Sequence, residues 1–374
     1  MAQHRSGRRL LGLETIARTL ERRRALVHPP SLVSRRRPSW ADHSQSELLR
    51  LRLCDLDLSL ESSWLKLEID LLMRRIADRA LLLKPDFYLS DEWMTPDDCL
   101  GIGVPFYLMH PKLMHLERTF MLEVEGGTRP WAQRLLRHEA GHVVCNAYRL
   151  HRRPGWRQVF GSPSVPYPKQ YRPDPTSKDY VVHLDGWYAQ CHPDEDWAET
   201  FAVWLSPRAH WRRRYAGWPA LAKLEYVDQL MAELEGAAPE LVPRRRPYSL
   251  PQLKLTLGDY YRRKQMRYGI EFPQNLDPRL ERIFTRDRRV GVAATSFLRQ
   301  NRQSILRHAR HCGHRRTREI ESWSTERAFD SLLLRCRELE LRCVGRPRRT
   351  LAACASLVAL CARCGQLEPG VVAV

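Results

Sequence analysis

The sequence contains no run of about 18 consecutive apolar residues, the length that an α-helix needs to cross a bilayer. The N-terminal region also lacks the uninterrupted apolar core of a secretory signal peptide, because Glu14 and Arg18 interrupt the stretch from Leu10 to Leu20. We therefore expect a cytoplasmic protein that does not associate with a membrane.

A glycine-rich phosphate loop of the Walker or dinucleotide type is also missing. The nearest candidate, Gly101-Ile102-Gly103-Val104-Pro105, is too short, and Pro105 would block the helix that such a loop must open. The ten cysteines show no recognised paired zinc spacing. Without a signal peptide, they indicate free thiols in a reducing compartment.

Positive charge is abundant but unevenly distributed along the 374 residues, which carry a net charge of +19. Residues 1–40 contain ten Arg and two Glu, and residues 302–350 contain thirteen Arg and six acidic residues. Such blocks could bind nucleic acid or another polyanion, but they also occur as solvated helix faces and tails, which we favour here. Residues 1–46 are expected to form a disordered basic arm.

The segment from Arg137 to Val144 contains the pattern H-E-x-x-H, formed by His138, Glu139 and His142. On a helix this spacing places two imidazoles on one face, one turn apart, with a carboxylate beside them. Two neutral imidazoles can bind zinc, and the glutamate can accept a proton from a metal-bound water. The alternative is a core helix whose histidines bond to the backbone, and we consider it weaker for the complete triplet.

The residues around this pattern favour a helix. Thr128 is a suitable N-cap, and Pro130 lies in the first turn, where a missing N–H does no harm. Trp131, Leu135 and Cys145 extend the stripe of the two histidines at steps of three and four. The histidines should therefore face the interior.

A catalytic zinc site needs a third protein ligand, and a second predicted helix offers one. Pro193 opens this helix, acidic residues fill its first turn, and Pro207 follows its end. Glu195 and Glu199 share one face of a helix that is otherwise rich in apolar residues, so a buried carboxylate there needs a cation. Glu195 is the preferred ligand, with Asp194 and Glu199 as alternatives.

These two helices resemble those of the gluzincin metallopeptidases, in which the first acid of the second helix is the third zinc ligand. The resemblance implies that Glu199, one turn later, orients a ligand histidine. Tyr188 resembles a tyrosine that a lethal-factor-like branch places beside the metal, where it could stabilise an oxyanion.

A closer resemblance is to the bacterial family called putative zinc-binding metallopeptidases. Four segments carry it: Phe87–Trp93, Glu123–Thr128, the H-E-x-x-H helix and Asp194–Phe201. It extends over about Leu48 to Arg310. It implies one zinc ion bound by His138, His142 and Glu195, and a peptide or protein substrate.

The expected fold class is α+β and mainly helical, with a zincin-like catalytic unit at residues 47–240 and a basic helical C-terminal extension at 241–374. Runs rich in β-formers at Phe87–Leu89, Val104–Leu108 and Tyr180–Leu184 predict short strands. Helices are expected within 47–83, where Leu65, Ile69, Leu72 and Ile76 form a stripe, and at Trp218–Glu235 and Pro251–Tyr268. By family analogy, a small sheet lies over the H-E-x-x-H helix.

The sequence thus predicts a zinc metallopeptidase in which Glu139 is the general base and acid, Tyr188 assists catalysis and Glu199 supports a ligand histidine. One alternative is a zinc hydrolase acting on an amide or ester that is not a peptide. The other is a polyanion-binding or nucleic-acid-binding protein with a structural zinc. The oligomeric state cannot be predicted from these patterns.

Overall fold

The computed structural model of the protein describes residues 38–121, 123–207, 209–241, 245–268, 276–311, 318–363 and 372–373. In this part of the chain helices predominate, and the strands form small two-stranded sheets. None of the described helices is both long enough and apolar enough to span a membrane.

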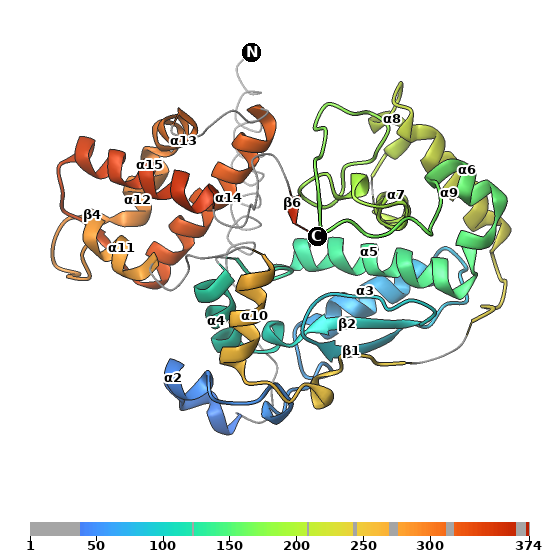
Figure 1. The fold of residues 1–374 in the computed structure, drawn as a ribbon, viewed down its shortest axis with the longest axis horizontal. Coiled ribbons are helices and arrows are strands. Elements are labelled where there is room, and N and C mark those ends of the chain that lie inside the picture. Colours follow the sequence, from blue (N-terminus) through green and yellow to red (C-terminus); the bar gives the residue numbers. More distant parts are fainter. Residues whose placement is uncertain are drawn as a thin grey trace, which may run out of the picture.

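The helices that build the first part of the fold precede residue 270 (Figure 1). They are α2 (Gln45–Leu48), α3 (Leu65–Ala77), α4 (Pro111–Met121), α5 (Arg129–Ala147), α6 (Pro154–Phe160), α7 (Pro193–Leu205), α8 (Trp211–Arg214), α9 (Ala220–Glu233) and α10 (Leu257–Arg267). The later helices are α11 (Leu276–Ile283), α12 (Ala294–Gln300), α13 (Arg302–His311), α14 (Arg318–Glu338) and α15 (Pro347–Arg363).

Helix α5 carries the H-E-x-x-H pattern and runs through the middle of the first part (Figure 1). It begins after Thr128, as predicted, although the Thr128 side chain makes no capping hydrogen bond. Helix α7 packs closely along it, because Gly141 has no side chain: a Cβ there would lie 2.9 Å from the Cα of Ala198. This close approach brings the acidic residues of α7 beside the histidines of α5.

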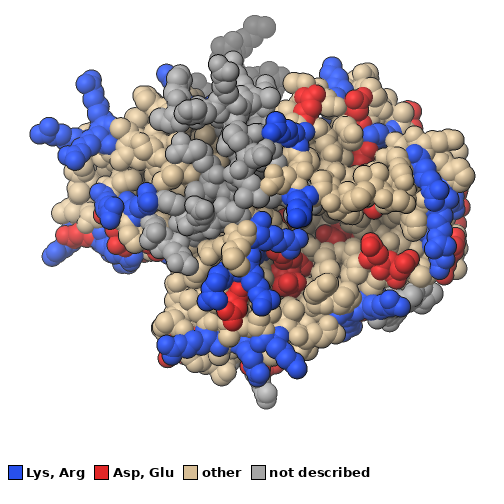
Figure 2. All heavy atoms as spheres, viewed as in Figure 1, with Lys and Arg blue, Asp and Glu red and all other residues tan. Residues whose placement is uncertain are grey.

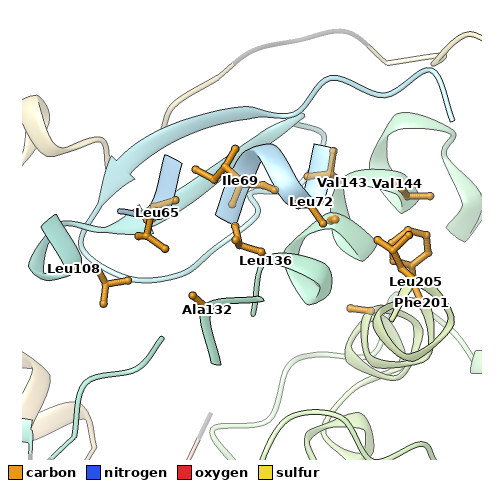
Figure 3. Close-up of a cluster of buried hydrophobic side chains, with 14 of the residues drawn as sticks. Leu65, Ile69, Leu72, Leu108, Ala132, Leu136, Val143, Val144, Phe201 and Leu205 are labelled. Atoms are coloured by element: carbon orange, nitrogen blue, oxygen red, sulfur yellow. The ribbon is translucent and has the colours of Figure 1, made fainter. Parts of the chain in front are cut away.

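Apolar side chains from α3, α5 and α7 form one continuous core around α5 (Figure 3). The predicted α3 stripe of Leu65, Ile69, Leu72 and Ile76 is buried, which confirms that helix. Leu136 and Val143 of α5 and Phe201 of α7 continue the core. By burial of apolar area, each such side chain contributes about 1.5–3 kcal/mol to folding. Helix α5 is thus fixed between two layers.

Strands β1 (Asp86–Ser90) and β2 (Gly101–Pro105) pair in parallel. The first predicted strand is confirmed, but the second was misplaced: β2 ends at Pro105, and Phe106–Met109 form a 3-10 turn. Proline lacks the N–H that a ladder needs, so the strand stops there. The loop between β1 and β2 lies against α5, because Asn146 Nδ2 donates to the carbonyl oxygens of Pro96 (3.0 Å) and Cys99 (3.1 Å).

The strand predicted at Tyr180–Leu184 does not form, and this prediction was wrong. Side chains bind the backbone N–H groups that a neighbouring strand would have bound. The Tyr215 hydroxyl oxygen accepts from the Val182 N–H at 3.0 Å, and a Glu199 carboxylate oxygen accepts from the Leu184 N–H at 2.7 Å. The segment is therefore an irregular link that is held by α7 and by Tyr215.

Helices α9 and α10 confirm the predictions for residues 218–235 and 251–268, although α10 begins only at Leu257. Pro251 lies instead in a 3-10 turn, Leu250–Gln252. The remaining strands are short pairs: β3 (Gln170–Tyr171) with β6 (Val372–Ala373), and β4 (Val292–Ala293) with β5 (Arg342–Cys343), both antiparallel. Through β6 the chain returns to the first part of the fold near α5 (Figure 1).

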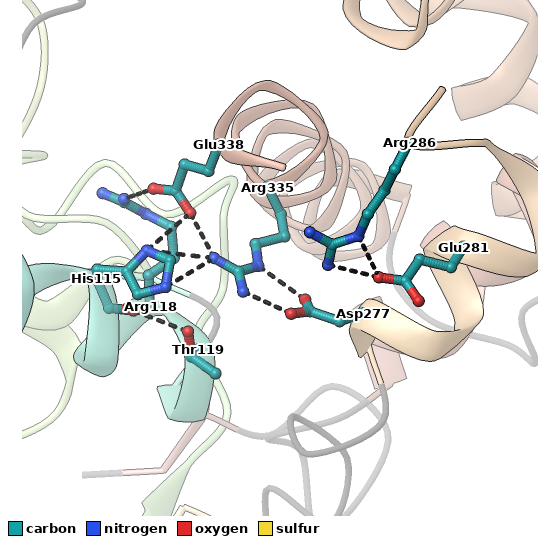
Figure 4. A network of polar contacts seen from close by, with 8 residues as sticks. All are labelled: His115, Arg118, Thr119, Asp277, Glu281, Arg286, Arg335 and Glu338. Atoms are coloured by element: carbon teal, nitrogen blue, oxygen red, sulfur yellow. Dashed lines mark hydrogen bonds and ion pairs between the residues drawn. The ribbon is translucent and has the colours of Figure 1, made fainter. Parts of the chain in front are cut away.

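A second apolar core forms between Leu276 and Ala362, separate from the first. Polar contacts join the two parts at α4 and α14 (Figure 4). Arg118 pairs with Glu338, and Arg335 Nη1 donates to Glu338 Oε2 at 2.8 Å. Arg335 also binds Asp277 of α11 at 2.6 Å, and its side chain is only 5% exposed. Arg335 therefore ties α14 to α11, and Glu338 ties α14 to α4.

The predicted division of the chain at residue 240 stays a prediction. The first core includes Leu250, Leu257 and Tyr261, which lie beyond that predicted boundary. Of the basic arm expected at residues 1–46, residues 1–37 lie outside the described residues. The rest is ordered around Trp40, which is buried and donates from its indole nitrogen to the Leu56 carbonyl oxygen at 2.8 Å.

Candidate metal centre

Three side chains of α5 and α7 bring their donor atoms together in a small triangle. His138 Nε2 lies 3.0 Å from Glu195 Oε2 and 3.1 Å from His142 Nε2, and the distance from His142 Nε2 to Glu195 Oε2 is 3.4 Å. His138 and Glu195 are almost completely buried, and the His142 side chain is 16% exposed. Among the described residues this is the group that could hold a metal ion.

The size of the triangle fits zinc. Zinc binds imidazole nitrogen and carboxylate oxygen at about 2.0–2.2 Å in tetrahedral sites, which places neighbouring ligand atoms about 3.3–3.5 Å apart. The three distances here, 3.0–3.4 Å, are close to one face of such a tetrahedron. A fourth position would stay open toward the cleft.

The chemistry of the donor atoms also fits a cation. His138 Nδ1 contacts Glu199 Oε1 at 2.9 Å, and if this nitrogen carries the proton of the neutral ring, Nε2 presents a lone pair. That lone pair faces Glu195 Oε2, which is buried and lacks a hydrogen-bond partner despite its 3.0 Å distance to the ring. Lone pairs that converge in a buried site need a positive charge between them.

Glu199 is fully buried and links the metal centre to the segment before α7. Its second carboxylate oxygen, Oε2, accepts from the Leu184 N–H at 2.7 Å. Burial raises the pKa of Glu199, but the hydrogen bond to His138 and the charge of His183 outweigh burial, so its pKa is lowered. The carboxylate is therefore ionised and contacts one nitrogen of the His138 ring.

Glu139 lies on the cleft side of α5. Its Oε2 accepts a hydrogen bond from the Thr95 hydroxyl at 2.8 Å, from the loop between β1 and β2. Burial raises the pKa of Glu139, and the charges of His138 and His142 lower it in part. A carboxylate with a raised pKa is a stronger base than one in water, as proton transfer near neutral pH requires.

Two tyrosines lie beside the metal centre. The Tyr188 ring is 5.7 Å from the His138 ring, and burial followed by the charge of Glu195 raises its pKa well above the ordinary value. Tyr188 is therefore a protonated donor. The Tyr167 hydroxyl donates to Glu195 Oε1 at 3.1 Å, and its ring stacks on His192 at a centroid distance of 3.8 Å.

The alternatives for the third ligand can be placed as well. Asp194 lies in the first turn of α7, where its N–H donates to His192 Nδ1 at 3.1 Å and its carboxylate lies 3.5 Å from the same nitrogen. Glu199 contacts the other side of the His138 ring. Glu195 alone among these acids lies between the two histidines.

The metal centre opens into a cleft of about 810 Å³. Ten carboxylic side chains and two cationic ones, Lys264 and Arg267, line it, although the chain as a whole carries +19. Figure 2 shows acidic side chains near the centre of this face, with Lys and Arg both beside them and at the edges. The C-terminal part adds Ala328 and Ser331 to the wall. The cleft therefore attracts cations.

One segment of the chain matches a known protein family. A family model described as putative zinc-binding metallo-peptidase matches residues 134–213. This segment contains His138, Glu139, His142, Tyr188, Glu195 and Glu199. The match supports the family resemblance over this segment, which is shorter than the resemblance expected from the sequence. No curated protein and no solved structure matches the chain.

Sequence reasoning missed Thr95 and Tyr167. Thr95 is 44 residues from Glu139 and carries no periodic pattern, so nothing in the sequence connects the two. Tyr167 belongs to the long loop between α6 and α7, whose length and Pro, Gly and Tyr content were the only signal that it could border a cleft. The contacts of both residues form only when segments that are distant in the sequence come together in the fold.

Proposed function

We propose that the protein is a zinc-dependent metallopeptidase of the gluzincin kind. The observation that carries this proposal is the buried triangle of His138 Nε2, His142 Nε2 and Glu195 Oε2, whose lone pairs converge at zinc-ligand spacing. The family match over residues 134–213 supports peptide-bond hydrolysis as the reaction. One zinc ion would be held by these three side chains.

When bound, zinc would supply Lewis-acid chemistry, by lowering the pKa of a water molecule and polarising a carbonyl group. Glu139 would take the proton of the attacking water on its carboxylate and then deliver it to the leaving amine. The Thr95 hydrogen bond at 2.8 Å holds that carboxylate on the cleft side of α5. Its raised pKa suits both halves of the proton transfer.

The side chains around the three ligands would orient the ligands and stabilise charge on the substrate. Tyr188, which stays protonated, would donate its hydroxyl to the oxyanion that develops on the substrate carbonyl. Glu199 would keep the Nε2 of His138 directed toward the metal. The Tyr167 hydroxyl, bonded to Glu195 Oε1, would fix which carboxylate oxygen faces the histidines.

Two alternatives remain. The same ligand set could serve a hydrolase of other amides or esters, and the acidic cleft is large enough for a small molecule as well as a peptide. Binding of a polyanion through terminal arginines stays a prediction, since residues 1–37 lie outside the described part of the chain. The peptidase proposal is preferred because the family match covers all the site residues predicted from the sequence.

The test is hydrolysis of an unbiased peptide mixture by zinc-loaded protein, followed by mass spectrometry. Wild-type protein should produce defined cleavages, and Glu139→Gln should bind zinc normally but lose about 10²–10⁴-fold in rate. Glu225→Gln, which changes an exposed acid of α9, is the matched control and should keep full activity. Equal cleavage by wild type and Glu139→Gln would refute the proposal, because it would indicate a contaminating peptidase.

A further inference from the structure

The cleft follows one face of α5 past the metal centre. Its lining on this helix begins at Trp131 and ends at Asn146. With a rise of about 1.5 Å per residue, these two positions lie about 22 Å apart along the helix. An extended peptide advances about 3.3 Å per residue, so the cleft has room for about six residues of a peptide. The metal ligands His138 and His142 lie between its two ends.

At the end near the start of α5, the cations that line the cleft are paired with carboxylates. Lys264 Nζ donates to Glu117 Oε1 at 3.0 Å, and Arg267 Nη1 donates to Glu92 Oε2 at 2.9 Å. Both cations belong to α10, which lies beside α4, the helix that leads into α5 (Figure 1). Opposite charges therefore balance one another at this end.

At the other end, the loop between β1 and β2 brings Asp97 and Asp98 into the lining of the cleft. Asn146 fixes this loop against α5 by donating to the carbonyl oxygens on either side of the two aspartates, those of Pro96 and Cys99. Both aspartates are exposed. Among the described residues, neither carboxylate makes a hydrogen bond or an ion pair. This end of the cleft thus carries two negative charges without a partner in the described chain.

Within the described part of the chain, no cation of the lining balances these two charges. The Lys and the Arg of the lining are both on α10, at the opposite end. His151 lines the cleft at the aspartate end, where its Nδ1 lies 3.9 Å from Cys145 Sγ. Burial, followed by the charge of Arg152, lowers the pKa of His151, so its ring is uncharged at neutral pH. Arg157 donates from Nε to the His151 carbonyl oxygen at 3.0 Å but does not line the cleft.

A separate observation indicates that a ligand binds in the same cleft. Glu195 is only 5% exposed, and its Oε2, which belongs to the metal centre, has no hydrogen-bond partner. Asn146, which fixes the aspartate loop, lies one helical turn after His142, or about 6 Å farther along α5. A peptide bound across the metal centre would reach this loop within about two residues of the bond that is cleaved.

We propose that Asp97 and Asp98 form a subsite that binds a Lys or Arg side chain of the substrate, so that the cleft selects basic peptides. This inference rests on the proposed function, because it assumes that a peptide lies across the metal centre. Complementary charge favours the matching partner, and a like charge at the same position disfavours the wrong one. An acidic side chain of a peptide would therefore be repelled at this end.

The test is peptide binding to zinc-loaded Glu139→Gln, measured by fluorescence anisotropy. The probes are labelled alanine-rich hexapeptides that carry a single Lys, Gln or Glu at each position in turn. At one position Lys should bind about threefold to tenfold more tightly than Gln, and Glu should bind more weakly than Gln. Raising the salt concentration should reduce this preference, because salt screens exposed charges.

Adding Asp97→Asn and Asp98→Asn together should lower the ratio of Lys affinity to Gln affinity to about one. The matched control adds Asp179→Asn and Glu225→Gln, which remove two exposed carboxylates that do not line the cleft, and it should keep the full preference. If the double aspartate variant does not fold, Asp97→Lys serves instead and should make Glu the preferred side chain at that position.

Equal affinity for the Lys and Gln probes at every position, or no measurable binding of any probe, would overturn the proposal. A Lys preference that survives the loss of both aspartates would also overturn it, because the cation would then bind elsewhere. Binding to Glu139→Gln does not require hydrolysis, so this result is separate from the cleavage test of the proposed function. Wild type that cleaves peptides without a charge preference would remove the subsite alone, and a Lys preference in a chain that cleaves nothing would remove the peptidase alone.

Discussion

Glu199 Oε1 lies 2.9 Å from His138 Nδ1, on the side of the ring opposite Glu195. The two acids are one turn apart on α7 and contact the two nitrogens of the same imidazole. When the neutral ring donates a hydrogen bond from its Nδ1–H to Glu199, the lone pair of Nε2 points to the position that Glu195 and His142 also face. The spacing of two carboxylates on one helix thus places an acid against each ring nitrogen of a histidine on another.

Glu199→Gln should weaken zinc binding without removing a ligand. The amide carries no charge to hold the His138 N–H, so we expect the dissociation constant to rise about 10–100-fold, measured by competition with a chelator. Glu225→Gln, on the exposed face of α9, should leave the constant unchanged. If Glu199→Gln bound zinc as tightly as wild type, Glu199 would have no role in orienting His138.

Gly141→Ala should force α5 and α7 apart. The new Cβ would lie 2.9 Å from the Ala198 Cα and 3.1 Å from its carbonyl oxygen, and backbone cannot move aside cheaply. We expect a cost of about 1–3 kcal/mol from overpacking, which exceeds the roughly 1 kcal/mol that alanine gains over glycine in a helix. Urea unfolding should show the loss, and zinc binding should weaken because Glu195 moves with α7.

Gly155→Ala is the matched control for this change. It lies in helix α6, and the atoms nearest its Cβ would belong to the Tyr226 side chain, the first at 3.3 Å. The ring can shift by a few tenths of an ångström, so this variant should fold and bind zinc like wild type. Equal behaviour of the two glycine variants would contradict a special close approach at Gly141.

Glu338→Gln should weaken the contact between the two cores in a pH-dependent way. Burial raises the pKa of Glu338, but His115, Arg118 and Arg335 outweigh burial and lower it to about 2. Since the folded-state pKa is below the unfolded one, the stabilisation is complete above about pH 5 and is lost as pH falls toward 2. The difference in Tm between wild type and variant should therefore be largest near pH 7 and should shrink at pH 3.5.

A pKa shift of this size stabilises the folded state by roughly 2–4 kcal/mol at neutral pH. Glu281→Gln provides the comparison, because Glu281 pairs with Arg286 at the surface, where both side chains are at least 40% exposed. Such a surface pair is worth about 0–1 kcal/mol, so its removal should change the Tm little. A Glu338→Gln effect that is equally small at every pH would show that the network in Figure 4 does not stabilise the contact.

Much of the metal centre could be predicted because it depends on local helix geometry. The four-residue spacing of His138 and His142 fixes their common face before any tertiary contact is known. Glu195 could be predicted from its position, as a carboxylate on the buried side of an apolar helix. The helices themselves followed from periodicity and from the prolines that begin α5 and α7.

The parts that could not be predicted depend on contacts between distant segments. Thr95 reaches Glu139 only because the β1–β2 loop lies along α5. Tyr180–Leu184 has the composition of a strand, but the Tyr215 hydroxyl and the Glu199 carboxylate take its backbone N–H groups.

The central claim is that His138, His142 and Glu195 hold one zinc ion, and the most direct measurement is the zinc-to-protein ratio by mass spectrometry of the native chain. We predict a ratio near one for wild type and Glu139→Gln, and near zero for His142→Ala and Glu195→Ala, with all four proteins folded by circular dichroism. A folded wild type that fails to take up zinc when the ion is added back would contradict the account. A Glu195→Ala variant that retains a full equivalent of zinc would also contradict it.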